Sequence, residues 1–228
     1  MRHIYIPAFA FLAFGFAAPA SAATPQNPAV VEVFTSQGCS SCPPADANVR
    51  ALADRPDVLA LSFAVTYWDK LGWKDTFGQD IFTKRQRDYE PPLHEHSPFT
   101  PQVIVDGRAD TTGIARSDIE KLVAQSNRSG GPDVHLSANA VSIDAGQGDA
   151  EVWLVRYDPR TVTVPVNRGE NAGATLQVRN AVHSLIKLGR WDGTAEQYKV
   201  PAAEESGLKT AVLVQRRGNG PILAVARD

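Results

Sequence analysis

Apolar positions divide the chain into two parts with different periodicities. From Pro28 to about Asn127, short continuous apolar runs alternate with segments whose apolar residues recur at helical spacing. The runs at 30–35, 58–65 and 102–106 predict strands, and the first has the unbroken character of a strand buried on both faces. Helices are predicted after Pro43, between Phe77 and Tyr89, and after Ser117. With a short hairpin partner at 111–114, the predicted order is β-α-β-α-β-β-α.

Beyond Gly130-Gly131-Pro132 the pattern changes to strands separated by turns. Apolar and β-branched runs occur at 134–137, 141–143, 150–157, 162–166, 175–188, 211–216 and 222–226. Roughly seven strands of this kind are typical of a small sandwich or of a β-extension on another domain. We therefore expect one domain over residues 23–130 and a mainly-β region over 131–228 packed on it.

The first 22 residues have the pattern of a secretory signal peptide. Basic residues at the start precede an apolar stretch from Ile4 to Ala18, and Ala20-Ser21-Ala22 supplies a cleavage site. The apolar stretch is about 15 residues long, whereas a membrane-spanning helix needs about 20. We expect cleavage near Ala22-Ala23 and a secreted or periplasmic protein with no membrane attachment. An uncleaved anchor is the alternative.

Composition changes this picture little. The chain is 43% hydrophobic and 21% charged, which is ordinary for a globular protein. Removing Arg2 with the signal leaves 22 Lys and Arg against 25 Asp and Glu, a formal charge of −3. This balance argues against binding to nucleic acid or to an anionic membrane.

The candidate chemistry lies in the two cysteines of the chain, Cys39 and Cys42, which are followed by Pro43-Pro44. A C-x-x-C between a strand and a helix is typical of a thiol–disulfide redox site. A helix N-terminus stabilises a thiolate, so Cys39 is the predicted nucleophile and Cys42 the resolving thiol. Such chemistry requires Cys39 to reach solvent.

Two other interpretations of the cysteines remain open. A static disulfide could brace the turn, although so short a loop gains little entropy from a cross-link. Alternatively, His94 and His96 could complete four metal ligands together with Cys39 and Cys42.

The strand–helix order, the C-x-x-C and Thr100-Pro101 before the third strand together resemble the thioredoxin fold. More specifically, the chain is similar to the secreted bacterial family named domain of unknown function 1223. The matching stretches are 33–46, 67–69, 71–75, 100–102, 105–107, 188–191 and 212–215. The resemblance implies an α/β thioredoxin-like fold with a C-terminal mainly-β extension or small β domain.

The resemblance also implies that Pro101 is a cis-proline beside the cysteines, leaving Thr100 free to pair with an extended substrate. An ordinary trans proline is the alternative. Trp68 follows the second predicted strand in an aromatic loop with Tyr67 and Trp73. We expect Trp68 to contribute to an apolar rim for a peptide substrate, the alternative being a loop tucked against the core.

These features predict an exported thiol–disulfide oxidoreductase that exchanges disulfides with the thiols or disulfides of a protein partner. No cofactor is expected, and the motifs of phosphate-binding loops, dinucleotide folds, serine hydrolases and zinc proteases are absent from the sequence. Two alternatives are a non-enzymatic binding module and a copper- or zinc-handling protein that uses the same cysteines.

Overall fold

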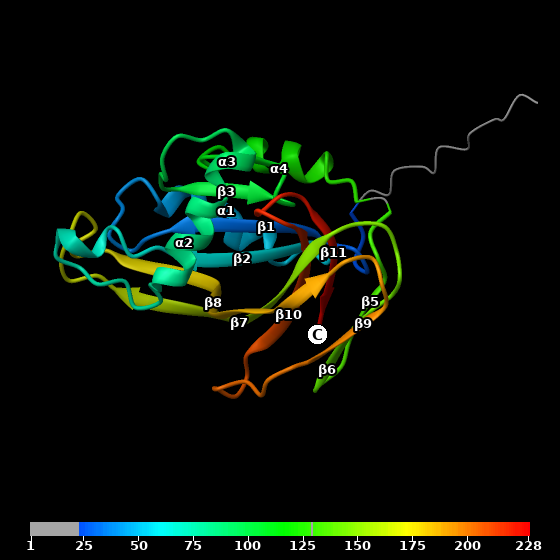
Figure 1. Ribbon diagram of the computed structural model, residues 1–228. Helices are drawn as coiled ribbons and strands as arrows, with labels where there is room; N and C mark the ends of the chain where they lie inside the picture. The colour runs from blue at the N-terminus through cyan, green and yellow to red at the C-terminus, as the bar shows by residue number, and fades with distance from the viewer. Residues whose placement is uncertain (1–22, 129) are drawn as a thin grey trace, which may run out of the picture.

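The computed structural model describes residues 23–128 and 130–228 and is built around one large mixed sheet. The sheet has eight strands in the order β11-β10-β7-β8-β2-β1-β3-β4 (Figure 1). Its strands are β1 (Ala29–Thr35), β2 (Val58–Ala64), β3 (Gln102–Val105), β4 (Ala109–Thr111), β7 (Ala150–Pro165), β8 (Thr175–Trp191), β10 (Lys209–Arg216) and β11 (Ile222–Arg227). A second sheet of three strands, β5 (Val134–Leu136), β6 (Ala140–Ile143) and β9 (Glu196–Lys199), lies at the right of the view.

Helices connect the strands of the first half of the chain. They are α1 (Pro43–Leu52), α2 (Asp80–Asp88), the single turn α3 (Glu90–Leu93) and α4 (Arg116–Ala124), with a 3-10 turn η1 (Asp69–Leu71) before α2. As predicted, α1 begins at Pro43, where the missing amide proton of proline costs no hydrogen bond. Within residues 23–128 and 130–228, no helix combines the length and apolarity that crossing a membrane requires. The predicted signal peptide lies outside the described residues.

The expected α/β thioredoxin-like fold class is wrong. Strands make up 39% of the structure and helices 17%, and the sheet draws its eight strands from both halves of the chain. In the large sheet only the β1–β2 and β2–β8 pairs are parallel, and β2 meets β8 where Ser62 lies opposite Ala181. Of the strands expected as an extension, β7, β8, β10 and β11 therefore continue the same sheet, whereas β5 and β6 belong to the second sheet. A domain boundary near residue 130 stays a prediction from composition.

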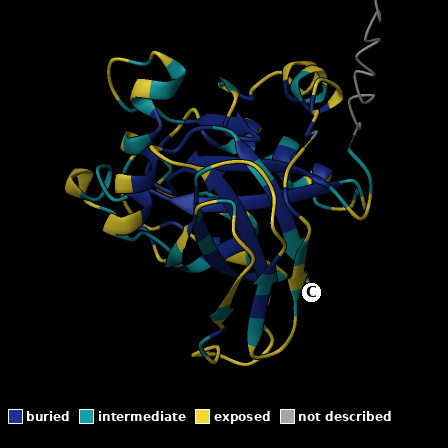
Figure 2. Ribbon diagram, turned by 45° about the vertical axis from the view of Figure 1, so that its right-hand side comes forward, coloured by how far each residue is buried: buried dark blue, intermediate teal, exposed yellow. Residues whose placement is uncertain are grey.

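Helices cover both faces of β1, which explains its full burial. Ala29, Val31 and Val33 face a core that includes residues of α1 and α4, as alternate side chains of a strand must share a face. Val30 and Phe34 face the opposite core, which includes Phe82 of α2 and apolar residues of β7, β8, β10 and β11. Figure 2 shows these central strands in dark blue, with exposed residues concentrated in the loops.

A third core joins the small sheet to the large one. Val141 and Ile143 of β6 pack with the fully buried Trp191 and with apolar residues of β7 and β10. At the other edge of the large sheet, the amide of Ile222 donates to the carbonyl of Asp106 after β3, at 2.9 Å. The sheet therefore curls until its β11 end reaches the end of β3.

A buried polar network lies inside the curl of the sheet. Arg85 of α2 and Glu32 of β1 form an ion pair with a nitrogen–oxygen distance of 2.7 Å, and their side chains are 2% and 1% exposed. The hydroxyl of Tyr89 donates to the other oxygen of Glu32. Arg85 also donates to the amide oxygen of Gln215 on β10, at 3.1 Å. One charged pair thus links β1, α2 and β10.

We predict that Arg85→Met lowers the free energy of unfolding by about 3–5 kcal/mol, because Glu32 would stay buried without a counter-charge. Urea unfolding followed by circular dichroism measures this loss.

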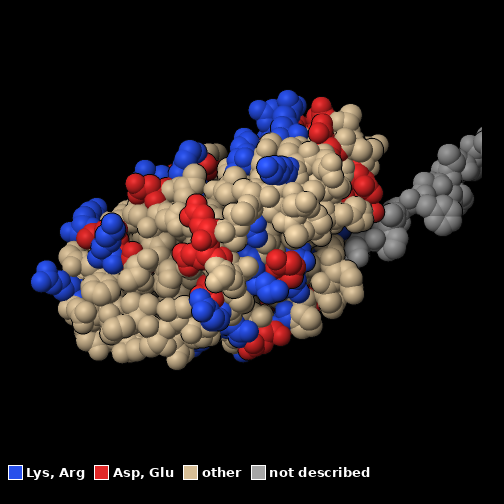
Figure 3. All heavy atoms as spheres, turned by 90° about the horizontal axis from the view of Figure 1, so that it is seen from below, with Lys and Arg blue, Asp and Glu red and all other residues tan. Residues whose placement is uncertain are grey.

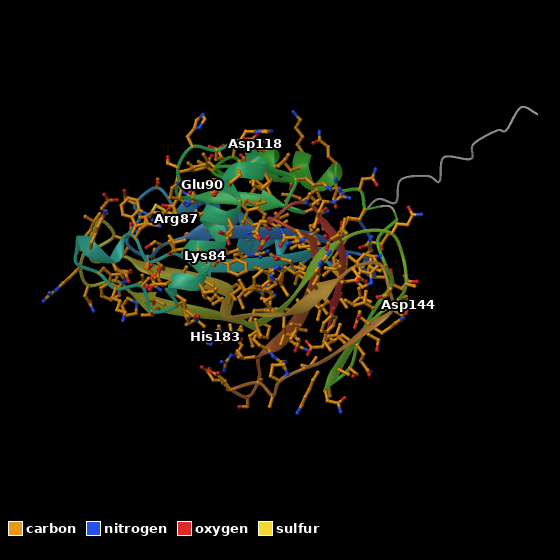
Figure 4. The ribbon with its side chains drawn as sticks, in the orientation of Figure 1. Lys84, Arg87, Glu90, Asp118, Asp144 and His183 are labelled. Carbon is orange, nitrogen blue, oxygen red and sulfur yellow. A yellow bond between two sulfur atoms is a disulfide. The ribbon has the colours of Figure 1, made fainter. Side chains whose placement is uncertain are left out.

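The control is Lys84→Met on the same helix (Figure 4), which breaks an exposed pair with Asp88. Exposed pairs contribute less than about 1 kcal/mol, so its effect should be small. Equal losses in the two variants would contradict a special role for the buried pair.

Candidate functional site

The turn between β1 and α1 carries the two cysteines, which form a disulfide with a Cα–Cα distance of 5.5 Å. The chain leaves β1 at Thr35, and the amide of Cys39 donates to the carbonyl of Ser36 at 3.1 Å. The amide of Cys42 then donates to the carbonyl of Cys39 at 3.2 Å, and Cys42 is the residue directly before the helix. The predicted position of the pair between a strand and a helix is confirmed, but Cys42 rather than Cys39 lies at the start of α1.

Both cysteines are fully buried, with no exposed surface on either residue. Only Ser40 and Ser41 between them are exposed. The solvent access that thiol chemistry requires of Cys39 is therefore not present in the disulfide-bonded form. An attacking thiol can reach the sulfurs only if a neighbouring segment moves.

The Thr100–Pro101 peptide bond lies against the disulfide and is cis, as the resemblance implied. The carbonyl oxygen of Thr100 lies 3.8 Å from the sulfur of Cys39 and accepts a hydrogen bond of 3.4 Å from Ser41. Residues 61 positions apart in the chain thus meet at one sulfur atom. The carbonyl of Thr100 is thus directed at the cysteine turn.

Trp68 reaches the same place from the loop after β2. Its indole nitrogen donates to the hydroxyl of Thr100 at 2.8 Å, and its ring packs against the core on the α2 side of the sheet. The structure therefore brings Trp68, Thr100 and Cys39 together, with the indole half-buried. A role for Trp68 and Thr100 in binding substrate stays a prediction.

Two segments hold the backbone of Gln37, two residues before Cys39. Its amide donates to the carboxylate of Asp75 at 2.7 Å, and its carbonyl accepts from the side chain of Asn171 at 3.0 Å. Its side-chain oxygen accepts from the indole nitrogen of Trp73 at 2.9 Å. The conformation of the cysteine turn therefore depends on residues far away in the sequence.

The connection between β7 and β8 covers the outer side of the turn. One carboxylate oxygen of Glu170 accepts from the amide of Ser40 at 3.1 Å and from its hydroxyl at 2.8 Å. The side chain of Asn171 donates to the carbonyl of Cys39 at 2.8 Å. Sequence reasoning missed both residues, because nothing local in 166–174 indicates a contact 130 residues upstream.

The half-buried residue Asp46, with one carboxyl oxygen fully buried, lies behind the turn on the first part of α1. Asp46 accepts a hydrogen bond of 3.0 Å from Thr35, while its other oxygen is buried without a partner. Burial raises the pKa of Asp46 to about 7, and the Thr35 hydrogen bond offsets part of that rise. Burial also raises the pKa of Asp75, which lines the same small cavity. The carboxyl of Asp46 is therefore protonated below neutral pH.

The residues named for a metal do not come together. His94 and His96 are exposed, and His94 follows the single turn α3 with a left-handed φ of 61°. In the part of the chain that the structure describes, no group of three or more His, Cys, Asp or Glu residues is placed to hold a metal. The alternative site of Cys39, Cys42, His94 and His96 is thus not assembled.

The face of the molecule seen from below carries both positive and negative side chains. Figure 3 shows lysine and arginine side chains interspersed with aspartate and glutamate, beside a broad uncharged area. This face therefore carries no extended patch of one sign of charge.

A comparison with family models identifies the family of the chain, and two solved structures are similar to it. A family model described as "Protein of unknown function (DUF1223)" matches residues 30–215. The crystal structure of protein AGR_C_4864 from Agrobacterium tumefaciens is similar with a TM-score of 0.73 and 30% identity, over 87% of this chain and 92% of that one. HBP35 of Porphyromonas gingivalis shares the fold, with a TM-score of 0.56 and 14% identity over 92% of this chain and 76% of that one. No curated protein matches.

We predict that Asp46 makes stability fall as pH rises toward neutrality. A carboxyl whose pKa is raised on folding favours the folded state in its protonated form. Its contribution is fully present below the unfolded pKa near 4 and is lost as pH rises through about 7. Between pH 5 and pH 8, Asp46→Asn should remove a decrease on the order of 2 kcal/mol in the free energy of unfolding.

The measurement is urea unfolding at both pH values, with Asp118→Asn as the control. Asp118 is exposed on α4 (Figure 4), so that variant should follow the wild type. A wild-type pH dependence that Asp46→Asn leaves unchanged would show that the buried carboxyl does not titrate as described.

Proposed function

The chain belongs to the DUF1223 family, whose description states no activity, and we propose that it is an exported thiol–disulfide oxidoreductase acting through Cys39 and Cys42. The observation that carries this proposal is the disulfide before α1, with the cis Thr100–Pro101 backbone 3.8 Å from the Cys39 sulfur. The predicted signal peptide supports export, and an oxidising compartment is where such a bond persists.

Exchange with a partner follows from two thiol–disulfide steps. A partner thiolate attacks the sulfur of Cys39, the Cys39–Cys42 bond breaks, and Cys42 leaves as a thiolate that takes up a proton. A second partner thiolate then attacks the partner's sulfur in the mixed disulfide and releases Cys39. Two electrons pass from the partner dithiol to the pair, and the same steps run backwards when the partner arrives as a disulfide.

The contact with the Thr100 carbonyl favours Cys39 as the exchanging sulfur. The positive end of the dipole of this ten-residue helix favours a thiolate near it, while Pro43 and Pro44 at its first two positions have no amide proton to donate. Cys42 lies directly before the helix, where it can attack a mixed disulfide on Cys39. With no third cysteine in the sequence, a separate molecule must return the pair to its starting state.

Thr100 and Trp68 are the proposed contacts for the partner chain. The Thr100 carbonyl is directed at the Cys39 sulfur, so an extended segment carrying the reacting cysteine could pair with this backbone. The Trp68 indole fixes the Thr100 hydroxyl and offers an apolar surface beside it. This arrangement fits a protein partner better than a small thiol, which needs no backbone pairing.

Burial of both sulfurs supports a second candidate, a non-enzymatic binding module whose disulfide only braces the turn. In that case, the Cys39→Ser, Cys42→Ser double variant would retain the cellular function of the protein. An oxidoreductase would lose it, because the exchanging sulfurs would be gone.

We predict that Cys42→Ser traps partner proteins on Cys39. Without the resolving thiol, a mixed disulfide on Cys39 persists. After thiol-blocking of intact cells, non-reducing electrophoresis should show complexes that disappear on reduction, and mass spectrometry should locate the linkage at Cys39.

The matched control is Cys39→Ser, which leaves the resolving cysteine alone and should trap at least tenfold fewer complexes. Equal trapping by both variants, or none by either, would count against Cys39 as the exchanging residue.

A further inference from the structure

The loop between β7 and β8 brings a carboxylate to the cysteine turn, and neither cysteine contributes to that contact. Glu170 is exposed, yet one of its oxygens accepts both the amide and the hydroxyl of Ser40, at 3.1 and 2.8 Å. These two hydrogen bonds lower the pKa of Glu170 below its ordinary value. A negative charge therefore rests on the residue that directly follows Cys39.

Neutral contacts fix this loop in place beside the charge. Asn171 donates to the carbonyl oxygens of Gln37 and Cys39 at 3.0 and 2.8 Å. Gly169 has a left-handed φ of 78°, and a Cβ at that position would lie 3.3 Å from the Cβ of Trp73. In Figure 1 the β7–β8 hairpin reaches the left end of the molecule beside the segment that carries η1. The loop is thus held by several contacts that do not involve the Glu170 charge.

We propose that Glu170 is a positioning residue that sets the redox poise of the Cys39–Cys42 pair. Its carboxylate occupies the Ser40 amide and places negative charge beside Cys39, so it destabilises the Cys39 thiolate and favours the disulfide. This inference rests on the proposed function, because the thiolate that it concerns is the exchanging species.

The other charged groups around the turn stay unchanged when Glu170 is replaced, so their effect on the disulfide can be separated from that of Glu170. Asp46 lies on α1 behind the turn and Asp75 holds the Gln37 amide, and both are present whatever stands at position 170. Arg50 of α1 donates to the carbonyl of Gln177. A change confined to Glu170 therefore isolates one charge, and glutamine can keep the hydrogen bonds from Ser40 through its amide oxygen.

The test is the equilibrium of the folded protein with glutathione. Two glutathione thiols pass two electrons and two protons to the pair and become one glutathione disulfide. We expect Glu170→Gln to raise the equilibrium constant for reduction at least threefold, which is about 14 mV for a two-electron couple. Alkylation rates of the reduced protein as a function of pH should show a lower Cys39 pKa.

Three further variants distinguish the effect of the Glu170 charge from the effect of the loop on access to the disulfide. Glu170→Asp keeps the charge, so its equilibrium constant for reduction should stay within about twofold of the wild-type value. Glu204→Gln removes an exposed carboxylate elsewhere and should change neither quantity. Asn171→Ala loosens the loop without changing charge, so it should speed reduction while leaving the Cys39 pKa unchanged.

A measurement on the wild type alone gives a further check. Salt on the order of 1 M screens exposed charges, so it should shift the wild-type equilibrium toward that of Glu170→Gln. Wild-type values in Glu170→Gln, with no effect of salt, would overturn this inference and leave the proposed function standing. If partner trapping fails while Glu170→Gln shifts the equilibrium, the proposed function falls and the role of Glu170 stands.

Discussion

The buried ion pair between Glu32 and Arg85 is the interaction on which the arrangement of the molecule depends. It places a carboxylate in the middle of a fully buried strand and satisfies it from α2, Tyr89 and, through Arg85, Gln215 of β10. Buried charges of this kind specify an arrangement more than they add stability, because removing either partner leaves the other uncompensated. The same strand runs directly into the cysteine turn, so the network that anchors β1 also positions the site.

The turn itself is held from outside its own sequence. Asp75 and Asn171 bind its backbone, Thr100 lies against one sulfur, and Glu170 takes the exposed amide of Ser40. Both cysteines are buried in the disulfide form, and the Thr100 carbonyl lies against the sulfur of Cys39. Under the proposed function, reaction with a partner requires a segment beside the cysteines, such as that of Thr100, to move. If the protein exchanges disulfides, this burial should make it selective among partners and slow to react with small thiols.

Local signals in the sequence predicted local structure well. The unbroken apolar run predicted β1 and the paired prolines predicted the start of α1, whereas the cis Thr100–Pro101 bond was expected from the resemblance alone. The prediction of which strands share a sheet was wrong, because strand pairing is not a local property. The pairing of Ser62 with Ala181 joins two halves of the chain that composition separates. β9 was missed because Glu196, Gln197 and Lys199 are exposed and give no apolar alternation. Glu170 could not be found, since only the length and twist of β7 and β8 bring it to Ser40.

The central claim is that the Cys39–Cys42 bond can open and close within the folded protein. It is tested most directly by adding dithiothreitol to the native chain while thiol labelling and circular dichroism are followed together. We predict that both cysteines become labelled while the circular dichroism spectrum stays native, and that re-oxidation restores the disulfide. Labelling that appears only as the protein unfolds would contradict the claim and leave the disulfide a structural brace.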